Sequence, residues 1–534
     1  FAPELNAQNT SNKGKEFWVA YPGHIDELSS RLTLFLSADQ ATPYQVFIGN
    51  VLVDEGAIAS NTCRPTIINP NLRPVYVGSS NVVEPNKAIR VVTERPISLY
   101  SIISNSARTG GTLVLPSNTL SKEYYAYTYR NAGTSPGYAQ FTIVATEDDT
   151  RVEITPKEAE RYGNRQAGVP FIITLKKGEI YQYQSGNKGD LTGSHIKSLD
   201  GCKSIAVFSG NTWAAFCEDG NSRALSPSGG DNLYQQMFPV NAWGKKFVTA
   251  PFYNTINGSS ELLSIIISDD NTVVTVDGST TIAGGKTLSN PYNRGDVITF
   301  ASRTATVISA SKPISVAQIQ TSQTCNPSNP AVITNNGNAP FPGDPEITVL
   351  NPVEQTLSNI TVYTKLQNVP TQINRYYLNV IIKTADISSF RLDGSQISGF
   401  IPINSEYSYI TIDVTNMPAQ LRLTAAGGFS AIAYGYGNVE SYAYLAGANL
   451  QDFTFQPVSS VTKQKITSGC LGEPIDLSIN LPYKALNLRW EISGEPIFEE
   501  ANPLEVGVIT RDGVLYYVYK YPNVLTYNIA GDYT

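Results

Sequence analysis

The sequence predicts an all-β protein made of four repeated units, and two observations support this fold class. Short runs rich in Val, Ile, Thr and Tyr end in Asn, Asp, Gly or Pro, which is typical of strands and turns, whereas stretches with a helical period are almost absent. Similar segments also recur along the chain at intervals of roughly 110 to 120 residues, which indicates a repeated structural unit.

The clearest recurring segment consists of an apolar strand, an acidic turn and a second, alternating strand. Its copies are LTLFLSADQATPYQVFIG (32–49), FTIVATEDDTRVEITP (141–156), LSIIISDDNTVVTVDG (263–278) and LNVIIKTADISSFRLDG (378–394). We expect each copy to be a β-hairpin, because Asp and Asn adopt left-handed backbone angles and bond within their own turns. Calcium binding is the alternative for the acidic turns. It is disfavoured because two copies keep a single acidic residue, Asp39 or Asp386, whereas calcium needs several converging oxygens.

A second recurring segment follows each copy and helps to set the unit boundaries. It reads ERPISLYSI (94–102), CKSIAVFSGN (202–211), SKPISVAQIQ (311–320) and GFSAIAYGYG (428–437). We expect an N-terminal segment at 1–13 and a four-repeat domain at 14–456, with units at about 14–110, 111–232, 233–343 and 344–456. Each unit is longer than a propeller blade of about 40–50 residues, which favours β-sandwich-like units. A propeller-like ring of four elaborated blades is the alternative.

The composition changes after Phe455, and the last segment, 457–534, has features of an immunoglobulin-like module. Cys470 is followed by Trp490 and then by a late GDYT that contains Tyr533, which is the order of conserved positions in such a sandwich. In this interpretation the closing strands are missing, so we expect an incomplete domain at the C-terminal end and a longer, multidomain protein.

Charge and hydropathy exclude two classes of partner. The formal net charge is −7 and no Lys/Arg cluster stands out, so nucleic acid is not expected as a partner. No apolar run approaches the roughly 20 residues of a membrane span, so membrane insertion of this segment is not expected either. The chain begins FAPELN, which we interpret as a mature N-terminus after signal cleavage or as an engineered start. We therefore expect an extracellular protein.

The sequence contains no catalytic constellation. The two histidines, His24 and His195, lie in different units, are expected to be partly exposed, and are not part of an H-E-x-x-H motif. Neighbouring carboxylates recur only as turn residues. We therefore predict no enzyme activity and no catalytic, cofactor-binding or metal-binding residues. Among the five cysteines, Cys202 and Cys217 flank one predicted strand and are candidates for a local disulfide.

The loops after the second recurring segment are the candidate contact surface. They span 104–111, 214–231 and 321–344. If the units stack, these loops share one side, where binding elements usually vary; the alternative is that they only connect units. Trp213, Tyr234 and Trp243 are the candidate ligand contacts, and packing between units is the alternative role for these aromatic residues.

Several segments together resemble the N-terminal domain family of IgGFc-binding proteins, over about residues 10–456. They are GKEFWVAYP, DLTGSHI, CKSIAVFSGN, DNLYQQMFPVNAWGKKFVTAP and KPISVAQ. The most specific run includes Asp231, Leu233, Gln235, Gln236, Pro239, Val240, Trp243, Gly244, Lys245, Phe247 and Val248. The namesake is a secreted, mucin-associated protein that binds antibody Fc. Bacterial members resemble the heads of large, gliding-associated surface adhesins of Bacteroidota, which carry immunoglobulin-like modules and a type IX secretion-sorting domain. The segment 457–534 favours this bacterial branch.

Together these features predict a non-enzymatic, extracellular adhesion or binding head of a large cell-surface protein. Its expected partner is an unidentified surface glycan or glycoprotein. The alternative function is a structural assembly element that contacts other copies or the secretion or motility machinery. A carbohydrate-active enzyme whose acid pair is split between units is a third hypothesis.

Overall fold

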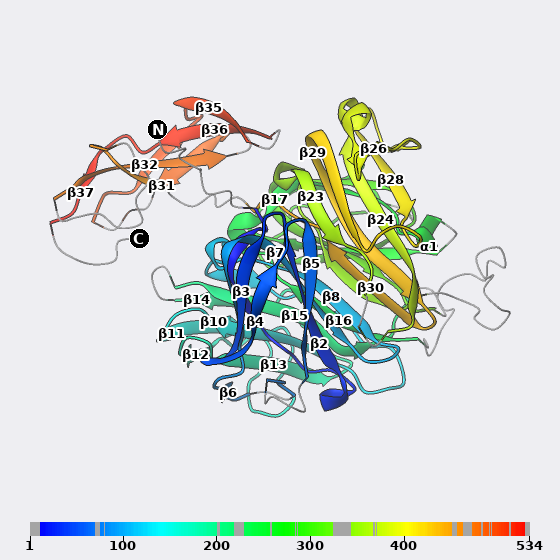
Figure 1. The fold of residues 1–534 in the computed structure, drawn as a ribbon. Coiled ribbons are helices and arrows are strands. Elements are labelled where there is room, and N and C mark those ends of the chain that lie inside the picture. The colour runs from blue at the N-terminus through cyan, green and yellow to red at the C-terminus, as the bar shows by residue number, and fades with distance from the viewer. Residues whose placement is uncertain are drawn as a thin grey trace.

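The prediction of an all-β protein is confirmed by the computed structural model, shown in Figure 1. It describes residues 11–69, 75–78, 81–199, 203–217, 229–256, 259–282, 285, 287–323, 343–366, 369, 371–450, 456–462, 472–481, 484–490, 492, 494–511 and 514–528. In these ranges the helical elements are the four-residue α1 (Tyr253–Ile256) and short 3-10 helices. No helix found there is long and apolar enough to span a membrane.

The first unit is organised around one long, bent strand. Its elements are β1 (Gly14–Val19), η1 (Glu27–Ser29), β2 (Arg31–Ala38), β3 (Thr42–Ile48), β4 (Val51–Ile58), β5 (Thr62–Ile68), β6 (Val83–Glu84), β7 (Ile89–Ser104) and β8 (Thr109–Val114). The first half of β7 pairs with β1 and β3, and its second half pairs with β2 and β8. The first half alternates between buried and partly exposed residues, whereas the second half is buried throughout. One strand therefore links an outer sheet to an inner sheet.

The second unit divides the same arrangement between two separate sheets. Its elements are η2 (Ser117–Thr119), β9 (Glu123–Tyr125), β10 (Tyr138–Ala145), β11 (Thr150–Thr155), β12 (Phe171–Leu175), β13 (Ile180–Asn187), β14 (His195–Ser198), β15 (Ile205–Ala214) and β16 (Asp231–Gln236). The strand orders are β16-β15-β10-β13-β6 and β12-β11-β14-β9, so β6 of the first unit completes an edge of the second.

The third and fourth units each have a long strand that corresponds to β7. The third contains η3 (Val240–Ala242), β17 (Gly244–Thr249), α1, β18 (Glu261–Ile267), β19 (Val274–Val276), β20 (Val297–Ser302), β21 (Thr306–Gln320) and β22 (Glu346–Val349). The fourth contains η6 (Val353–Gln355), β23 (Leu357–Tyr363), β24 (Ile373–Lys383), η7 (Thr384–Ser389), β25 (Arg391–Leu392), β26 (Ser395–Gln396), β27 (Ile401–Pro402), β28 (Tyr407–Asp413), β29 (Gln420–Gly437) and β30 (Glu440–Leu445). The long strands are β21 and β29.

The sequence explains where the long strands bend. The register of β7 against β1 shifts between Val92 and Ile97, and that of β21 against β17 shifts between Ser309 and Ile314. Pro96 and Pro313 lie in these irregular stretches, and a proline has no N–H for a sheet ladder. The recurring "PIS" segments thus mark the change from the outer to the inner sheet.

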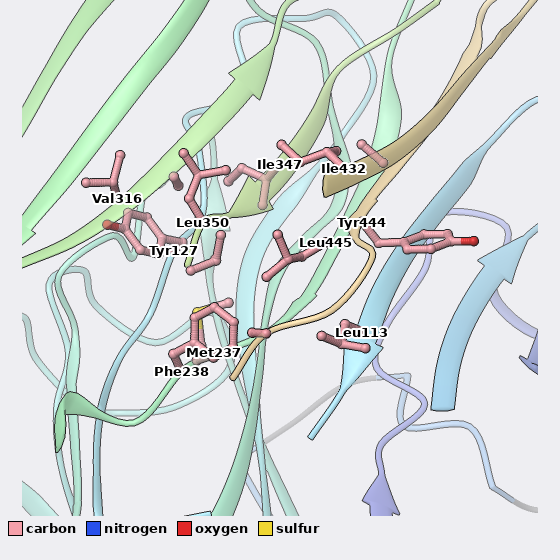
Figure 2. Packing of buried hydrophobic residues seen from close by; sticks show 14 of the residues in the cluster. Leu113, Tyr127, Met237, Phe238, Val316, Ile347, Leu350, Ile432, Tyr444 and Leu445 are labelled. Carbon is pink, nitrogen blue, oxygen red and sulfur yellow. The ribbon is translucent and has the colours of Figure 1, made fainter. Parts of the chain in front are cut away.

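The inner strands of the four units form a closed ring around a common axis. β8 packs beside β16 and β30, and β22 packs beside the same two strands. In Figure 2 apolar side chains from all four units meet here, among them Leu113, Met237, Ile347 and Leu445. The units are therefore sandwich-like in themselves and ring-like in arrangement. β8, β16, β22 and β30 each lie at the end of a sheet or pair off its path, and the predicted unit boundaries stay a prediction.

The ring closes where the fourth unit meets the first, which lie side by side in Figure 1. The hydroxyl of Tyr100 donates to the carbonyls of Ala446 at 2.6 Å and Thr361 at 3.3 Å. The ring of Phe35 stacks on that of Tyr363 at 4.8 Å between centroids. These contacts join residues more than 250 positions apart in the chain.

The prediction that the acidic turns close hairpins is wrong. Asp149 and Asn271 lie in turns as expected, whereas Asp386 lies in the 3-10 helix η7. β10 pairs with β13 and β15, while β11 pairs with β12 and β14, so the turn at 146–149 carries the chain from one sheet to another. The corresponding pairs in the other units, β2 with β3, β18 with β19 and β24 with β25, are not ladder partners either. Asp149 and Asn271 have positive φ angles of 54° and 58°. Turn chemistry alone does not distinguish a hairpin from an arch between packed sheets.

The last segment has its own small core. Its elements are β31 (Gln456–Ser459), β32 (Pro474–Leu481), β33 (Asn487–Trp490), β34 (Phe498–Ala501), β35 (Gly507–Arg511), β36 (Val514–Lys520) and β37 (Leu525–Thr526). Trp490 is buried against Leu477, Tyr521 and Leu525. Cys470 and Tyr533 lie outside the described residues, so the immunoglobulin-like assignment stays a prediction.

Candidate functional site

The four inner strands begin at the same end of the axis, which we call the axial face. The amide of Thr109 at the start of β8 donates to Asp231 Oδ1 at 2.6 Å, and the amide of Ser441 in β30 donates to Asp231 Oδ2 at 3.1 Å. The amide of Asp344, just before β22, donates to Ser441 Oγ at 2.7 Å. All four strand starts are thus connected by side-chain hydrogen bonds.

Charged residues occupy equivalent positions at the axial face in three units. Arg108, Asp231 and Asp344 each stand eight residues before a proline, at 116, 239 and 352 (116 − 108, 239 − 231 and 352 − 344). Each proline immediately precedes a 3-10 helix, η2, η3 or η6, so the spacing reflects the repeated fold. The repeated spacing of eight residues to a proline could have identified these three residues from the sequence. Of the three, only Asp231 was named among the candidate residues, as part of a family resemblance.

Asp231 acts as a clamp between units. Its carboxylate also accepts the amide of Asn232 at 2.9 Å, so three backbone N–H groups converge on one fully buried side chain. Burial raises the pKa of Asp231 well above its usual range, and nearby Asp344 and Glu440 raise it further. The backbone amide of Ser441 opposes this increase in pKa by stabilising the ionised form, but burial outweighs it.

Glu440 makes a similar clamp at the start of β30. Its carboxylate accepts the hydroxyls of Thr109 at 2.5 Å and Thr371 at 2.7 Å and the amide of Gln372 at 2.5 Å. Burial raises the pKa of Glu440, and these hydrogen bonds oppose that effect. The two clamps together fix the first, second and fourth units relative to one another.

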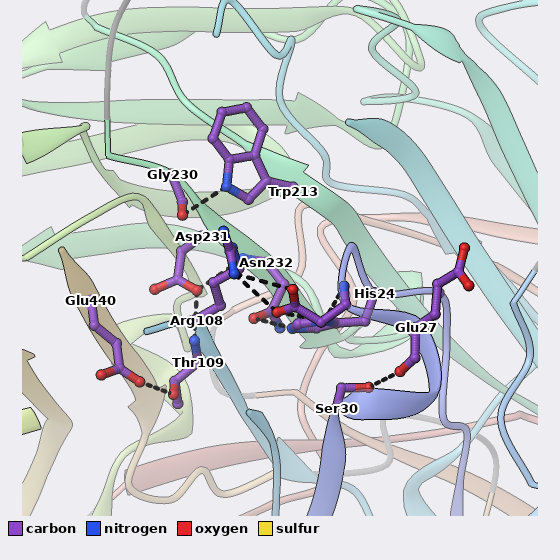
Figure 3. A network of polar contacts seen from close by, with 12 residues as sticks. His24, Glu27, Ser30, Arg108, Thr109, Trp213, Gly230, Asp231, Asn232 and Glu440 are labelled. Carbon is purple, nitrogen blue, oxygen red and sulfur yellow. Dashed lines mark hydrogen bonds and ion pairs between the residues drawn. The ribbon is translucent and has the colours of Figure 1, made fainter. Parts of the chain in front are cut away.

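Arg108 and His24 form the outer part of the network shown in Figure 3. Arg108 Nη1 contacts both carboxylate oxygens of Asp26 at 3.1 Å. His24 accepts the amide of Asp26 at Nδ1 and therefore donates from Nε2 to Asn232 Oδ1 at 3.1 Å. The expectation that His24 is partly exposed is wrong: it is buried, and burial lowers its pKa to about 4. His24 is therefore a neutral link between Asp26 and Asn232. The other histidine, His195, is half-buried and contacts Glu123 at 2.7 Å.

Asp344 has few partners compared with the other axial carboxylates. Its Oδ1 accepts only a long hydrogen bond from the amide of Gln323, at 3.4 Å, and its Oδ2 has no hydrogen-bond partner in the described parts of the chain. The pKa of Asp344 is raised to about 8, mainly by burial, and Glu440 adds to this increase in pKa. The Gln323 amide and the charge of Arg108 lower the pKa. The side chain lines a narrow pocket between the third and fourth units.

The three candidate ligand contacts are buried. Trp213 donates from its indole to the carbonyl of Gly230 at 2.8 Å, and Trp243 donates to that of Phe238 at 3.2 Å. The Tyr234 hydroxyl donates to the carbonyl of Ala20 at 3.1 Å, across the boundary between the first two units. Burial favours packing over ligand contact for these residues, and their role in binding stays a prediction.

The long connections of the second and third units leave the axial face side by side. The amide of Phe216 donates to Ser322 Oγ and the amide of Ser322 donates to the carbonyl of Phe216, both at 2.9 Å. Most of the predicted contact loops 214–231 and 321–344 lies outside the described residues. Cys217 is disulfide-bonded, but Cys202 is also outside the described residues, so the Cys202–Cys217 pairing stays a prediction.

The chemistry that the axial face supports is recognition by oxygen and amide groups on a rigid frame. Among the described residues no three His, Cys, Asp or Glu side chains are grouped so as to hold a metal ion by themselves. The calcium alternative for the acidic turns is therefore not supported by a cluster of this kind in the part of the chain described.

Comparison with known proteins gives one family match. The family described as IgGFc binding protein matches residues 110–435. No curated protein sequence matches the chain. Among solved structures, a rhamnosidase of family GH78 from Bacillus sp. GL1 is similar with 11% identity, over 68% of this chain and 56% of the rhamnosidase chain, so less than two thirds of that protein is covered. The TM-score of 0.13 is too low to indicate a shared fold.

Proposed function

The chain belongs to the IgGFc-binding protein family, whose members are typically extracellular binding proteins, and from this premise we propose that it is the non-enzymatic binding head of a larger cell-surface protein. In this proposal the axial face presents the contact surface. Its ligand is a protein or glycoprotein, as the family name suggests, and the larger protein is a secreted adhesin of the Bacteroidota type.

The observation that carries this proposal is the convergence of the connections before the inner strands at one end of the ring. The ends of these connections are fixed by buried polar residues, Asp231 and Glu440 among them, whereas the connections themselves differ in length from unit to unit. Variable loops on a rigid scaffold are the usual design of a binding surface.

The test is binding of the whole 534-residue chain to arrayed glycans, mucins and antibody Fc. In two variants, Gly/Ser segments of equal length replace residues 218–228 or 326–342, which leaves every cysteine in place. A matched control carries the same replacement in the exposed turn 279–281, on the outer part of the third unit.

Saturable binding that weakens about tenfold or more in either loop variant, but not in the control, would support the axial face as the contact surface. Binding that is equally strong in all variants would move the contact surface elsewhere on the chain. Absence of binding by a folded protein would argue against the binding head.

A second candidate function is a structural assembly element, and exposed apolar residues on the first unit favour it. Val51 and Leu52 in β4 are 64% and 41% exposed, and Ile67 in the contacting strand β5 is 45% exposed. β4 and β5 lie at the two ends of the strand order of their sheet, and edge strands with exposed apolar residues tend to associate. Light scattering over a range of concentrations tests this function: a mass that stays monomeric, and that Val51→Ser does not change, argues against it.

The proposal that the chain is not an enzyme has its own test. Release of reducing sugar from polysaccharides, abolished by single Asp or Glu substitutions at the axial face, would contradict it.

A further inference from the structure

A pocket beside Asp344 is a feature of the axial face that the clamps do not explain. It lies where the end of β21 meets β29 and the chain around α1, and Gln320, Tyr436 and Thr255 line it together with Asp344. The pocket has room for about one water-sized group, which is too little for a sugar ring or a side chain of another protein.

Three buried polar atoms at this pocket lack partners in the described parts of the chain: Asp344 Oδ2, Gln320 Nε2 and the hydroxyl of Tyr436. Asp344 is 1% exposed and Gln320 is 6% exposed. Buried polar atoms are almost always satisfied, because an unmade hydrogen bond costs about 1–3 kcal/mol. Three such atoms at one pocket therefore indicate an occupant.

The neighbouring hydroxyls indicate the charge of that occupant. Thr255 donates its hydrogen to Glu261 Oε2 at 2.8 Å, and Thr321 donates its hydrogen to the carbonyl of Ser260 at 3.1 Å. With their hydrogens committed, both hydroxyls can offer only lone pairs to the pocket. A 180° rotation of the Gln320 amide would add a carbonyl oxygen to this set.

The surrounding charge also favours a cation. Asp231, Glu440 and Glu346 are buried around the same axis as Asp344. The cationic group that offsets Asp344 is Arg108, which is itself paired with Asp26. Buried carboxylates are stable when a cation or several donors compensate them, and Asp344 has neither at its Oδ2.

We propose that the pocket between the third and fourth units binds a single hard cation of the calcium type. Asp344 Oδ2 is its anionic ligand, and the oxygens of Thr255, Thr321, Tyr436 and Gln320 are the neutral ligands that the pocket offers. Oxygen ligands of this kind suit Ca²⁺ and related ions, and a single carboxylate implies modest affinity, in the range of extracellular modules. This site is separate from the acidic turns and does not depend on the proposed binding function.

The test uses Tb³⁺ as a luminescent substitute for Ca²⁺, with Tyr436 at the pocket as the sensitiser. We expect saturable Tb³⁺ luminescence that Ca²⁺ displaces, and a thermal unfolding temperature that rises with added Ca²⁺. Asp344→Asn keeps the side-chain volume and is expected to weaken Tb³⁺ and Ca²⁺ binding by roughly tenfold or more. The matched control, Asp148→Asn, changes an acidic turn whose carboxylate only accepts the amide of Lys177, and it is expected to bind as wild type does.

A second variant separates loss of the ligand from misfolding. Gln320→Glu places a second carboxylate at the pocket and is expected to increase Ca²⁺ affinity several-fold. Asp344→Asn is expected to be no less stable than wild type in the presence of a chelator, because the carboxylate accepts a single long hydrogen bond. The proposal is overturned if wild type shows no saturable Tb³⁺ signal, if Asp344→Asn binds as wild type does, or if Asp148→Asn alone abolishes binding. Intact glycan or Fc binding without calcium would leave the proposed function standing even then.

Discussion

Asp231 and Asp344 occupy the same position in two repeats and have opposite surroundings. Asp231 accepts three backbone N–H groups from three strands, whereas Asp344 accepts one long hydrogen bond and lines a pocket. Both are buried. The repeated fold thus sets the position of the carboxylate. Contacts with the neighbouring unit determine whether that carboxylate joins the units by hydrogen bonds, as Asp231 does, or remains available to a ligand, as we propose for Asp344.

Two parts of the axial face therefore have distinct roles. Where the first, second and fourth units meet, the carboxylates of Asp231 and Glu440 are satisfied by the chain itself, which favours rigidity. Where the third and fourth units meet, polar atoms remain unsatisfied, and such sites are where ligands bind. The predictions below test this contrast.

The largest expected effect follows from Asp231→Ala. The substitution leaves the amides of Thr109, Asn232 and Ser441 buried without an acceptor, and each unmade bond costs about 1–3 kcal/mol. We expect a loss of about 3–5 kcal/mol in the free energy of unfolding, seen as a lower urea midpoint. Asp148→Ala, at an exposed turn, is the control and should change the midpoint little. A loss below about 1 kcal/mol for Asp231→Ala would show that the clamp is not structural.

Asp344 is expected to make the protein less stable as the pH rises, which is the opposite of the effect of an ordinary surface carboxylate. Its pKa is raised from 3.8 to about 8 in the folded chain, mainly by burial. The folded state therefore holds this proton more tightly than the unfolded state, so stability is full below pH 4 and declines as the pH rises from about 4 to about 8. In a chelator, wild type should lose on the order of a few kcal/mol relative to Asp344→Asn across this range. Urea midpoints at several pH values measure it, and parallel curves for the two proteins would refute the raised pKa.

The sequence was sufficient to predict the strands because strand formation depends on local pattern. Pro96 and Pro313 even marked the bends of the long strands. It was insufficient for the sheet partners. The turn at 146–149 has the residues of a hairpin and yet joins two sheets, because packing between sheets decided the pairing of β10 and β11. The ring arrangement could be stated only as an alternative for the same reason, since Tyr100 meets Ala446 only in the folded chain.

The candidate site was harder to predict than the fold. Trp213, Tyr234 and Trp243 were predicted as ligand contacts; they are buried with their polar atoms bonded internally, and their role in binding stays a prediction. Asp344 gave no sign of its importance beyond its spacing to Pro352. Whether a carboxylate is satisfied depends on donors from other units, and these donors are not adjacent to it in the sequence.

The contrast can be extended to the seam between the last and first units, where Tyr100 is the polar link. Tyr100→Phe removes the hydroxyl that donates to Ala446 and Thr361 and keeps the packing of the ring against Tyr444. We expect a loss of about 1–2 kcal/mol in the free energy of unfolding, less than for Asp231→Ala because one donor is lost instead of three bonds. Tyr162→Phe, at a side chain that is 54% exposed, is the control. Equal urea midpoints for the two variants would mean that apolar packing alone closes the ring.

The smallest effect on stability is expected for Glu123 in the second unit, which forms an ion pair with Arg294 in the third unit. Glu123 also contacts His195 at 2.7 Å. Burial alone would raise the pKa of Glu123, but hydrogen bonding and charge from His195 and the charge of Arg294 lower it from 4.5 to about 2. The pair therefore stabilises the fold above pH 4.5, and this contribution is lost as the pH falls towards 2. Because all three side chains are partly exposed, Glu123→Gln should cost about 1 kcal/mol or less at neutral pH, and added salt should reduce the difference. Suppose that Glu123→Gln lowers the free energy of unfolding as much as Asp231→Ala does, and that added salt does not change this loss. The ion pair between the second and third units would then stabilise the fold as strongly as the buried carboxylate of Asp231.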